Sequence, residues 1–350
     1  MASPALLVYP ERIRYNIQLM IKVAGNPDRL RPHVKTHKCR EIVAMQQDAG
    51  ISKFKCATIA EAEMLAECQV RDVLLAYQPS GPNGSRLLEL TRLYPSTEFS
   101  ALVDNIKTAE ELESLAAQAG KKLSLYIDLD VGMHRTGIAP GPEAFALKGY
   151  LESSKVLNLR GWHVYDGHIR HSEFEVRKQA VEQAFEPVRQ LISAGSQEIV
   201  AGGSPTFPVH ALNQEFNLSP GTCLLWDQGY SRILPDQEFL PAAMLLTRVI
   251  SKPGYNLLCL DLGHKALASE MPHPRVHFPD LQQLEFVGHS EEHLVVSSSQ
   301  AVDFQVGDEL YGIPMHICPT TALHQDLVVV ENGQAVDRWK VYARDRRISV

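Results

Sequence analysis

The sequence has no excess of positive charge. Its 34 Lys and Arg residues are outnumbered by 41 Asp and Glu residues, which gives a formal net charge of −7. Nucleic-acid-binding domains usually carry a basic surface, so this composition argues against a nucleic-acid partner. The sequence also has no apolar run long enough to span a bilayer, and its first residues lack a basic region followed by an apolar one. We therefore expect a cytoplasmic protein without a membrane anchor or signal peptide.

Paired cysteines are absent as well. The six cysteines are scattered along the chain, and none belongs to a Cys-x-x-Cys pair. This spacing is typical of reduced thiols in a cytoplasmic protein rather than of a disulfide framework. No Gly-x-Gly-x-x-Gly motif follows the first expected strand, which disfavours a dinucleotide-binding fold.

Short apolar segments alternate with helical segments through the first two-thirds of the chain. Expected strands include 72–77 and 123–130, and a long amphipathic helix is expected at 173–193. This alternation predicts a parallel sheet covered by helices. About eight such repeats fit a (β/α)8 barrel, and a doubly wound open sheet is the alternative.

Helical periodicity becomes scarce after Pro235 and Asp236. The segments that follow are strand-like and are separated by turns rich in Pro, Gly and Asn. We therefore expect a barrel domain at 10–235 and a mainly β domain at 236–350, which also includes an N-terminal strand at 1–9.

A dense run of basic residues lies at 31–38, with the sequence RPHVKTHK. On an extended strand alternate side chains share one face, so four basic residues would point the same way. They are Arg31, His33, Lys35 and His37. Either this face is solvated or an anion lies against it. Neighbouring cations also favour the neutral form of a lysine amine, which is the form that Schiff-base chemistry requires.

Polar segments follow several expected strands, at the end of a barrel where active sites lie. Two of them, 202–206 and 219–222, consist mostly of Gly, Ser, Thr and Pro. Such segments can present backbone N–H groups and hydroxyls to a phosphate, although each could also be a simple turn. A phosphate held there would supply the anion that the basic run needs.

A separate candidate site is His316-Ile317-Cys318 in the expected β domain. On a strand, the imidazole and the thiolate would share a face and could reach one metal ion, and this ligand pair suits zinc. Two protein ligands leave positions for water or substrate, as a catalytic metal site requires. A half-buried histidine beside a core cysteine is the alternative interpretation.

Together these segments resemble the D-threonine aldolase and D-serine dehydratase family. The basic run at 31–38 is similar to the lysine motif of that family and is followed by KFKCATIAEAEML at 53–65. The glycine-rich segments and the His-x-Cys pair come in the order that the family shows. The resemblance covers nearly the whole chain. It implies an alanine-racemase-type fold, in which a barrel that binds pyridoxal 5'-phosphate (PLP) precedes a β domain.

The resemblance also implies roles for single residues. Lys35 resembles the lysine that bonds covalently to PLP, with basic neighbours such as His33 assisting it. Arg135 resembles the arginine that contacts the phenolic oxygen of the cofactor, and Tyr165 the residue beside the cofactor ring or its phosphate. The expected phosphate contacts are Ser204, Thr206, Gly221 and Thr222.

His316 and Cys318 resemble the metal ligands of the family. Imidazole and thiolate make zinc the expected ion, with manganese and magnesium as alternatives. The resemblance further implies a homodimer, in which the β domain of one chain lies near the barrel of the other.

The implied activity is that of a PLP- and metal-dependent lyase acting on D-β-hydroxy amino acids. In the aldolase reaction the Cα–Cβ bond breaks, giving glycine and an aldehyde. In the alternative reaction, that of a D-serine or D-threo-3-hydroxyaspartate dehydratase, the products are a keto acid and ammonia. Cys318 is typical of the dehydratase branch, since aldolases often have Asp there, but the chain as a whole is closer to the aldolases. A racemase or a non-catalytic PLP-binding protein is less favoured.

Overall fold

The computed structural model describes residues 1–192 and 197–350. The predicted end of the long helix at Ser193 therefore lies outside the described residues. The described chain divides into two compact units, and each has its own β-sheet. Unit 1 consists of Met1–Ile17, Thr36–Glu41 and Thr222–Arg344, and unit 2 consists of Gln18–Lys35, Ile42–Gly221 and Asp345–Val350. Two helices, α1 (Pro10–Ala24) and α2 (Arg40–Asp48), contribute residues to both units.

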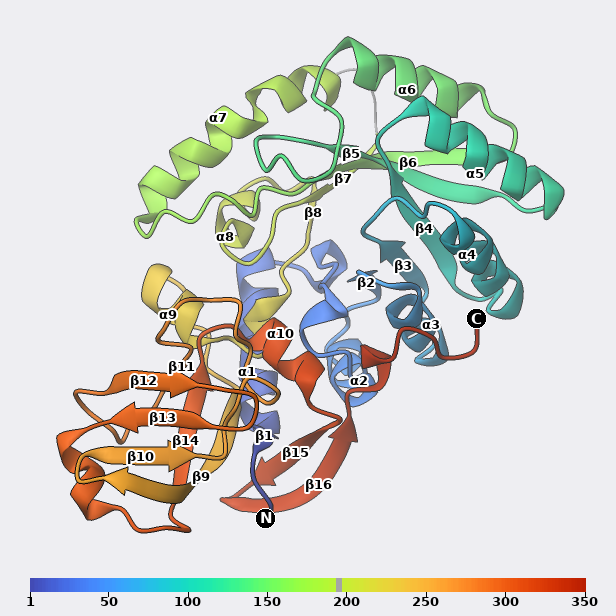
Figure 1. Cartoon of the computed structure of the whole chain (residues 1–350). Helices are drawn as coiled ribbons and strands as arrows, with labels where there is room; N and C mark the ends of the chain where they lie inside the picture. The colour runs from blue at the N-terminus through green and yellow to red at the C-terminus, as the bar shows by residue number, and fades with distance from the viewer. Residues whose placement is uncertain (193–196) are drawn as a thin grey trace. The chain divides into compact units, whose positions relative to one another are not determined.

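Unit 2 contains a parallel sheet whose strands follow one another in chain order (Figure 1). Its strands are β2 (Lys53–Cys56), β3 (Asp72–Leu75), β4 (Glu98–Val103), β5 (Leu123–Leu129), β6 (Leu157–Val164), β7 (Glu198–Ala201) and β8 (Phe216–Leu218). Single bridges join Leu30 to Leu218 of β8 and His33 to Lys55 of β2. The segment 30–33 thus takes the place of an eighth strand between the two ends of the sheet. The predicted barrel is confirmed, with one irregular strand, and the open-sheet alternative is wrong.

Helices follow the strands of unit 2 and cover the outer face of its sheet (Figure 1). They are α3 (Ile59–Glu67), α4 (Pro82–Leu93), α5 (Ile106–Gln118), α6 (Pro142–Ser153), α7 (Phe174–Ile192) and the short α8 (Phe207–His210). Helix α5 shows why the sequence folds this way. The side chain of Asn105 accepts the N–H of Thr108 at the start of the helix, and Ala109, Leu112 and Ala116 form its buried stripe.

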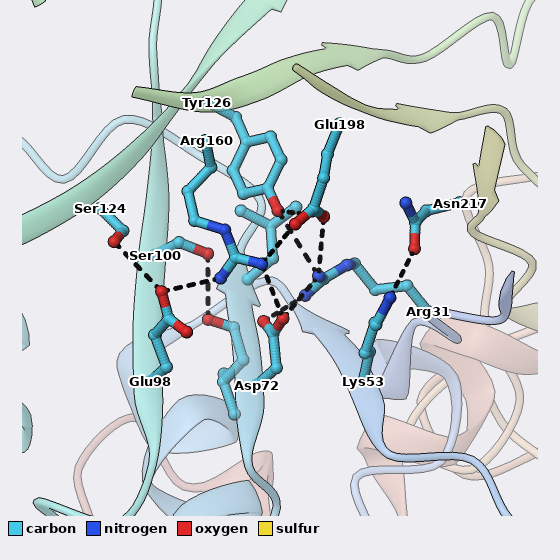
Figure 2. Close-up of polar contacts among 12 residues, drawn as sticks. Arg31, Lys53, Asp72, Glu98, Ser100, Ser124, Tyr126, Arg160, Glu198 and Asn217 are labelled. Carbon is cyan, nitrogen blue, oxygen red and sulfur yellow. Dashed lines mark hydrogen bonds and ion pairs between the residues drawn. The ribbon is translucent and has the colours of Figure 1, made fainter. Parts of the chain in front are cut away.

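A charged cluster lies at the N-terminal ends of the barrel strands (Figure 2). Arg31 donates to both oxygens of Asp72 at 2.6 and 2.9 Å. Arg160 donates to Asp72 at 3.1 Å and to Glu198 at 2.6 Å, and the Tyr126 hydroxyl donates to Glu198 at 2.9 Å. Burial alone raises the pKa of Asp72, but its hydrogen bond with Arg31 and the charges of Arg31 and Arg160 outweigh that effect, so its pKa is lowered.

Unit 1 contains a mixed sheet in the order β12-β13-β10-β9-β1-β15-β16, with β14 paired to β9 and β11 paired to β14. Strand β1 (Ala5–Val8) runs parallel to β15 (Asp326–Glu331) and antiparallel to β9 (Ala243–Gly254). The other strands are β10 (Leu257–Leu260), β11 (Val276–His277), β12 (Glu285–His289), β13 (Leu294–Ser297), β14 (Glu309–Pro314) and β16 (Gln334–Lys340). Two short helices, α9 (Gln228–Ile233) and α10 (Ile317–Leu323), complete the unit. The predicted mainly β C-terminal part is confirmed.

Among the described residues, no helix has the length and apolar character needed to cross a membrane.

Candidate active site

The basic run is not one extended strand. Its backbone is extended as far as His33, whose N–H donates to the carbonyl of Pro220 at 2.8 Å, and then forms a 3-10 helix at Val34–Thr36. The Nδ1 atom of His33 accepts the N–H of Lys35 at 3.3 Å, and this local bond stabilises the turn. The prediction that four basic side chains share one strand face is therefore wrong.

Two residues of the basic run, Arg31 and His37, make contacts that do not depend on the other basic residues of the run. Arg31 is fully buried and is balanced by Asp72 at the other end of the barrel interior. His37 is buried in unit 1, and its Nδ1 accepts the N–H of Cys39 at 3.2 Å. Burial lowers the pKa of His37 to about 3, so this imidazole is neutral at physiological pH.

Tyr165, directly after β6, lies at the centre of three cations in unit 2. The guanidinium carbon of Arg135 is 4.8 Å from the ring centroid, and Nζ of Lys35 is 6.0 Å from it. Nζ of a further lysine, Lys55, is 5.9 Å from the same centroid. A cation near an aromatic face is attracted by the ring quadrupole. The structure therefore brings Lys35, Arg135 and Tyr165 together.

The Tyr165 ring is held by close backbone packing. A Cβ atom added at Gly203 would come within 2.9 Å of the ring, and one at Gly167 would come within 2.2 Å of the hydroxyl. Real Cβ atoms essentially never approach other atoms so closely, so only glycine fits at these two positions with the ring in place. These two glycines therefore fix where the aromatic ring lies at the C-terminal end of the barrel.

A buried network of three polar side chains crosses the interior of the barrel. The sequence did not predict this network. Nζ of Lys55 on β2 is 3.4 Å from Nε2 of His163 on β6, and Nδ1 of His163 is 2.7 Å from Asp128 on β5. All three are buried, with Lys55 only 2% exposed. Burial and the charge of Lys35 lower the pKa of Lys55 to about 7. Burial, together with the charge of Lys55, also lowers the pKa of His163.

The direction of the hydrogen bonds in this network of Lys55, His163 and Asp128 follows from the charges. Asp128 is an acceptor, so Nδ1 of His163 carries the proton and donates to it. Nε2 of the neutral imidazole is then the acceptor for Lys55, in either protonation state of the lysine. The signal in the sequence was a lysine between Phe54 and Cys56 in an expected strand, but nothing local indicated its partners.

The residues predicted to contact the phosphate lie in three different local environments. The Oγ of Ser204 accepts the N–H of Gly221 at 3.2 Å, which joins the loops after β7 and β8. Thr206 is fully buried, and its hydroxyl donates to Asp166 at 2.6 Å. Thr222 belongs to unit 1, where its hydroxyl lies 3.5 Å from Sγ of Cys318.

His316 and Cys318 do not lie on a strand, and that prediction is wrong. Strand β14 ends at Pro314, His316 occupies the N-cap position of helix α10 without a side-chain capping hydrogen bond, and Cys318 lies in the first helical turn. Pro319 has no N–H to donate to a sheet, whereas the first turn of a helix tolerates proline well.

The surroundings of this pair favour positive charge. Nδ1 of His316 is 2.6 Å from Glu270, and Sγ of Cys318 is 3.2 Å from the hydroxyl of Thr36. Burial lowers the pKa of His316, but the hydrogen bond and charge of Cys318, the hydrogen bond of Glu270 and the charge of Asp227 raise it to about 9. No group of three or more His, Cys, Asp and Glu side chains placed to hold a metal ion occurs among the described residues. A metal on this pair would need water or substrate as further ligands.

Comparisons with known proteins agree with this architecture. Residues 8–227 match the alanine racemase N-terminal domain, and residues 242–330 match the putative serine dehydratase domain. The chain therefore belongs to the family of proteins with an alanine racemase N-terminal domain, and the predicted alanine-racemase-type fold is confirmed.

Relatives of known activity resemble the chain over almost all of its length. A D-threonine aldolase from Arthrobacter sp. is 28% identical, with 98% of this chain and 92% of the relative aligned. A 3-hydroxy-D-aspartate aldolase from Paracoccus denitrificans (strain Pd 1222) is 27% identical with the same coverage. The crystal structure of a D-threonine aldolase from Filomicrobium marinum is 25% identical with a TM-score of 0.90, covering 98% of this chain and 95% of that one.

Proposed function

We propose that this protein is a PLP- and metal-dependent lyase of D-β-hydroxy amino acids, of the D-threonine aldolase type. The observation that carries the proposal is the grouping of Lys35, Arg135 and Tyr165 at the barrel end where catalytic sites lie. The full-length similarity to named aldolases supports the choice of reaction.

The residues at this end of the barrel fit PLP. Lys35 supplies the primary amine that can hold the cofactor, and Tyr165 offers an aromatic surface beside a flat ring. Arg135 places a permanent positive charge next to that surface. When bound, PLP supplies an electron sink for negative charge that develops on the substrate. The protein's contribution is to hold the lysine amine, the arginine and the ring in one fixed group.

We propose that the loops after β7 and β8 hold the cofactor phosphate. The N–H of Gly221 donates to Ser204, so these two loops lie side by side, and their hydroxyl and backbone groups are the proposed phosphate contacts. Thr222 follows Gly221 directly and is assigned to the same phosphate. Thr206 uses its hydroxyl proton on Asp166, so its role is to shape the loop from which Ser204 projects.

We propose that His316 and Cys318 bind the divalent metal, with zinc as the first choice and manganese or magnesium as alternatives. The nearby carboxylates, which raise the pKa of His316, would stabilise a bound cation in the same way. The metal would act as a Lewis acid on the β-hydroxyl of the substrate. We also propose that the protein is cytoplasmic and forms a homodimer.

The second candidate is a dehydratase acting on D-serine or D-threo-3-hydroxyaspartate. The thiolate ligand Cys318 favours it, and a D-serine dehydratase from Dictyostelium discoideum is 24% identical over 95% of this chain. The two reactions use the same groups and differ in which substrate bond breaks.

Product analysis separates these candidates. Purified holoenzyme is incubated with D-threonine, D-serine and D-3-hydroxyaspartate, and the products are quantified by chromatography. Glycine and an aldehyde support the aldolase, whereas a keto acid and ammonia support the dehydratase. Formation of the L-enantiomer alone, or no reaction of PLP-loaded protein with any of the three, contradicts the proposed lyase.

A further inference from the structure

Lys55 is the one member of the cationic group around Tyr165 to which neither the resemblance nor the proposed function gives a role. Its side chain is buried, and it lies as close to the Tyr165 ring as Lys35 does, 5.9 against 6.0 Å. It is held from the far side of the barrel by His163, which is itself fixed by Asp128. Burying a charged lysine without an opposite charge beside it lowers the free energy of unfolding. A partner for the charge of Lys55 is therefore expected.

The charges that act on Lys55 do not balance. The largest charge effects on it come from Lys35, Asp128, Arg31 and Arg135, and of these only Asp128 is negative. Asp128 already accepts hydrogen bonds from His163 at 2.7 Å and from the Thr136 hydroxyl at 2.9 Å. Arg31 is compensated by Asp72. With Arg31 compensated, Asp128 is the one carboxylate among the main charges that act on Lys55, so an anion beside Tyr165 would be favoured.

The chemistry of PLP indicates which anion this is. The aldehyde and the phenolic oxygen of PLP are substituents of adjacent ring carbons, so a lysine that holds the aldehyde has the phenolic oxygen next to it. Lys55 interacts electrostatically with both Lys35 and Arg135, and all three face one aromatic ring. The phosphate is assigned to the loops of Ser204 and Gly221, which leaves the phenolic oxygen as the group for these cations.

We propose that Lys55 is a second cationic contact, beside Arg135, for the phenolate oxygen of bound PLP, and that His163 and Asp128 position it for this contact. The inference rests on the proposed function, because it takes PLP as the ligand. In this role Lys55 stabilises the anionic form of the cofactor and raises the affinity of the protein for PLP, without forming a covalent bond to it.

The test uses cofactor binding and absorption rather than turnover. Lys55→Met and Lys55→Arg variants are purified, stripped of cofactor and titrated with PLP. Removing the cation should weaken PLP binding about tenfold or more, because a charge-assisted contact is lost. It should also raise the pH midpoint of the visible absorption of the bound cofactor by about one unit, because the anionic form loses a stabilising charge. Lys55→Arg should restore most of both properties.

Lys53 provides the matched control. It lies on the same strand, two residues earlier, but Nζ of Lys53 donates to Asn217 at 3.1 Å at the N-terminal end of the barrel (Figure 2). A Lys53→Met variant should keep the PLP affinity and the absorption midpoint of the unaltered protein. A His163→Gln variant, which retains a hydrogen-bond acceptor for Lys55, should give a smaller shift than Lys55→Met.

The outcomes separate this inference from other roles. If Lys55→Met keeps both the PLP affinity and the midpoint but raises KM for D-3-hydroxyaspartate more than for D-threonine, Lys55 binds a substrate carboxylate and the inference is wrong. If affinity and midpoint are unchanged with every substrate unaffected, the inference is also wrong. If Lys55→Met does not fold, Lys55→Gln takes its place in the same comparison. Failure of the unaltered protein to bind PLP would instead overturn the proposed function itself.

Discussion

At the scale of single residues, two lysines face one tyrosine at nearly the same distance from its ring. The difference lies in their surroundings. Lys35 is half-buried on a 3-10 turn at the barrel end, whereas Lys55 is buried and bonded to His163. We assign covalent attachment to Lys35 because its side chain is only half-buried and its turn is held by His33.

The first prediction concerns Lys35. Lys35→Ala should abolish the visible absorption of PLP-loaded protein, because the amine that holds the cofactor is removed. Spectra recorded at equal protein concentration after removal of unbound PLP provide the measurement, with Lys53→Met as a control that keeps the absorption. Retained absorption in Lys35→Ala would exclude Lys35 as the attachment point and contradict the assignment.

The second prediction concerns the charge of Lys55 in the cofactor-free protein. Burial and Lys35 lower the pKa of Lys55 to about 7, whereas a lysine in the unfolded chain titrates near 10.4. Between these values the unfolded state binds more protons, so the free energy of unfolding should rise with pH, while below pH 7 the buried charge destabilises the fold.

Urea unfolding at several pH values tests this. Replacing Lys55 by Met should raise the free energy of unfolding at pH 6 by roughly 1–3 kcal/mol and should flatten the rise between pH 7 and 10. A Lys55→Met variant that is less stable than the unaltered protein at pH 6, or that shows the same rise, would contradict the prediction.

At the scale of elements, the charged cluster at the N-terminal strand ends ties β3, β6 and β7 to the segment 30–33 (Figure 2). This segment forms single bridges to its neighbours, with backbone hydrogen bonds from Arg31 to Leu218 and from Lys55 to Pro32. The bidentate pair of Arg31 with Asp72 adds a side-chain attachment to β3.

The third prediction follows from this cluster. Asp72→Asn should lower the free energy of unfolding by about 3 kcal/mol, because it leaves the fully buried Arg31 without its main partner. Since the pKa of Asp72 is lowered in the fold, the stabilisation it provides is complete above the pKa of an unfolded aspartate and is lost as the pH falls through the folded value.

The exposed pair of Glu89 and Arg92 on α4 provides the control for this measurement. Glu89→Gln should leave the unfolding midpoint in urea unchanged, because exposed ion pairs contribute little. Equal effects of the two substitutions would contradict a special role for the buried pair.

The elements also show where sequence patterns were sufficient. The alternation of apolar and helical segments predicted the barrel, because the buried face of each strand and helix is visible in the local spacing of its apolar residues. The basic run failed as a strand because a side-chain bond from His33 to the backbone of Lys35 turns the chain. His316-x-Cys318 failed for a similar reason, since Pro319 favours the start of a helix over a strand.

At the scale of the whole chain, the central polar groups of the site come from distant segments. Lys55 and His163 are 108 positions apart, and His163 and Asp128 are 35 apart. Only the closed sheet brings β2, β5 and β6 to a common interior, so no local sequence pattern could predict the network of these three side chains. Lys35, Arg135 and Tyr165 were predicted as one site because the resemblance supplied their grouping.

The fourth prediction concerns the metal. Chelation should remove the activity on D-β-hydroxy amino acids, and zinc or manganese should restore it, because the β-hydroxyl loses its Lewis acid. His316→Ala should lower the bound metal measured by atomic absorption while the visible absorption of PLP is retained. Exposed His293 provides a control, since His293→Ala should keep the metal content of the unaltered protein. Full activity after verified metal removal would contradict the metal role.

The central claim is that the assembled site breaks the Cα–Cβ bond of its substrate. The most direct measurement is the amount of glycine formed per D-threonine consumed by the PLP- and metal-loaded protein. We predict one glycine and one acetaldehyde for each D-threonine, with no ammonia released. Release of ammonia with 2-oxobutanoate in place of glycine would contradict the aldolase assignment.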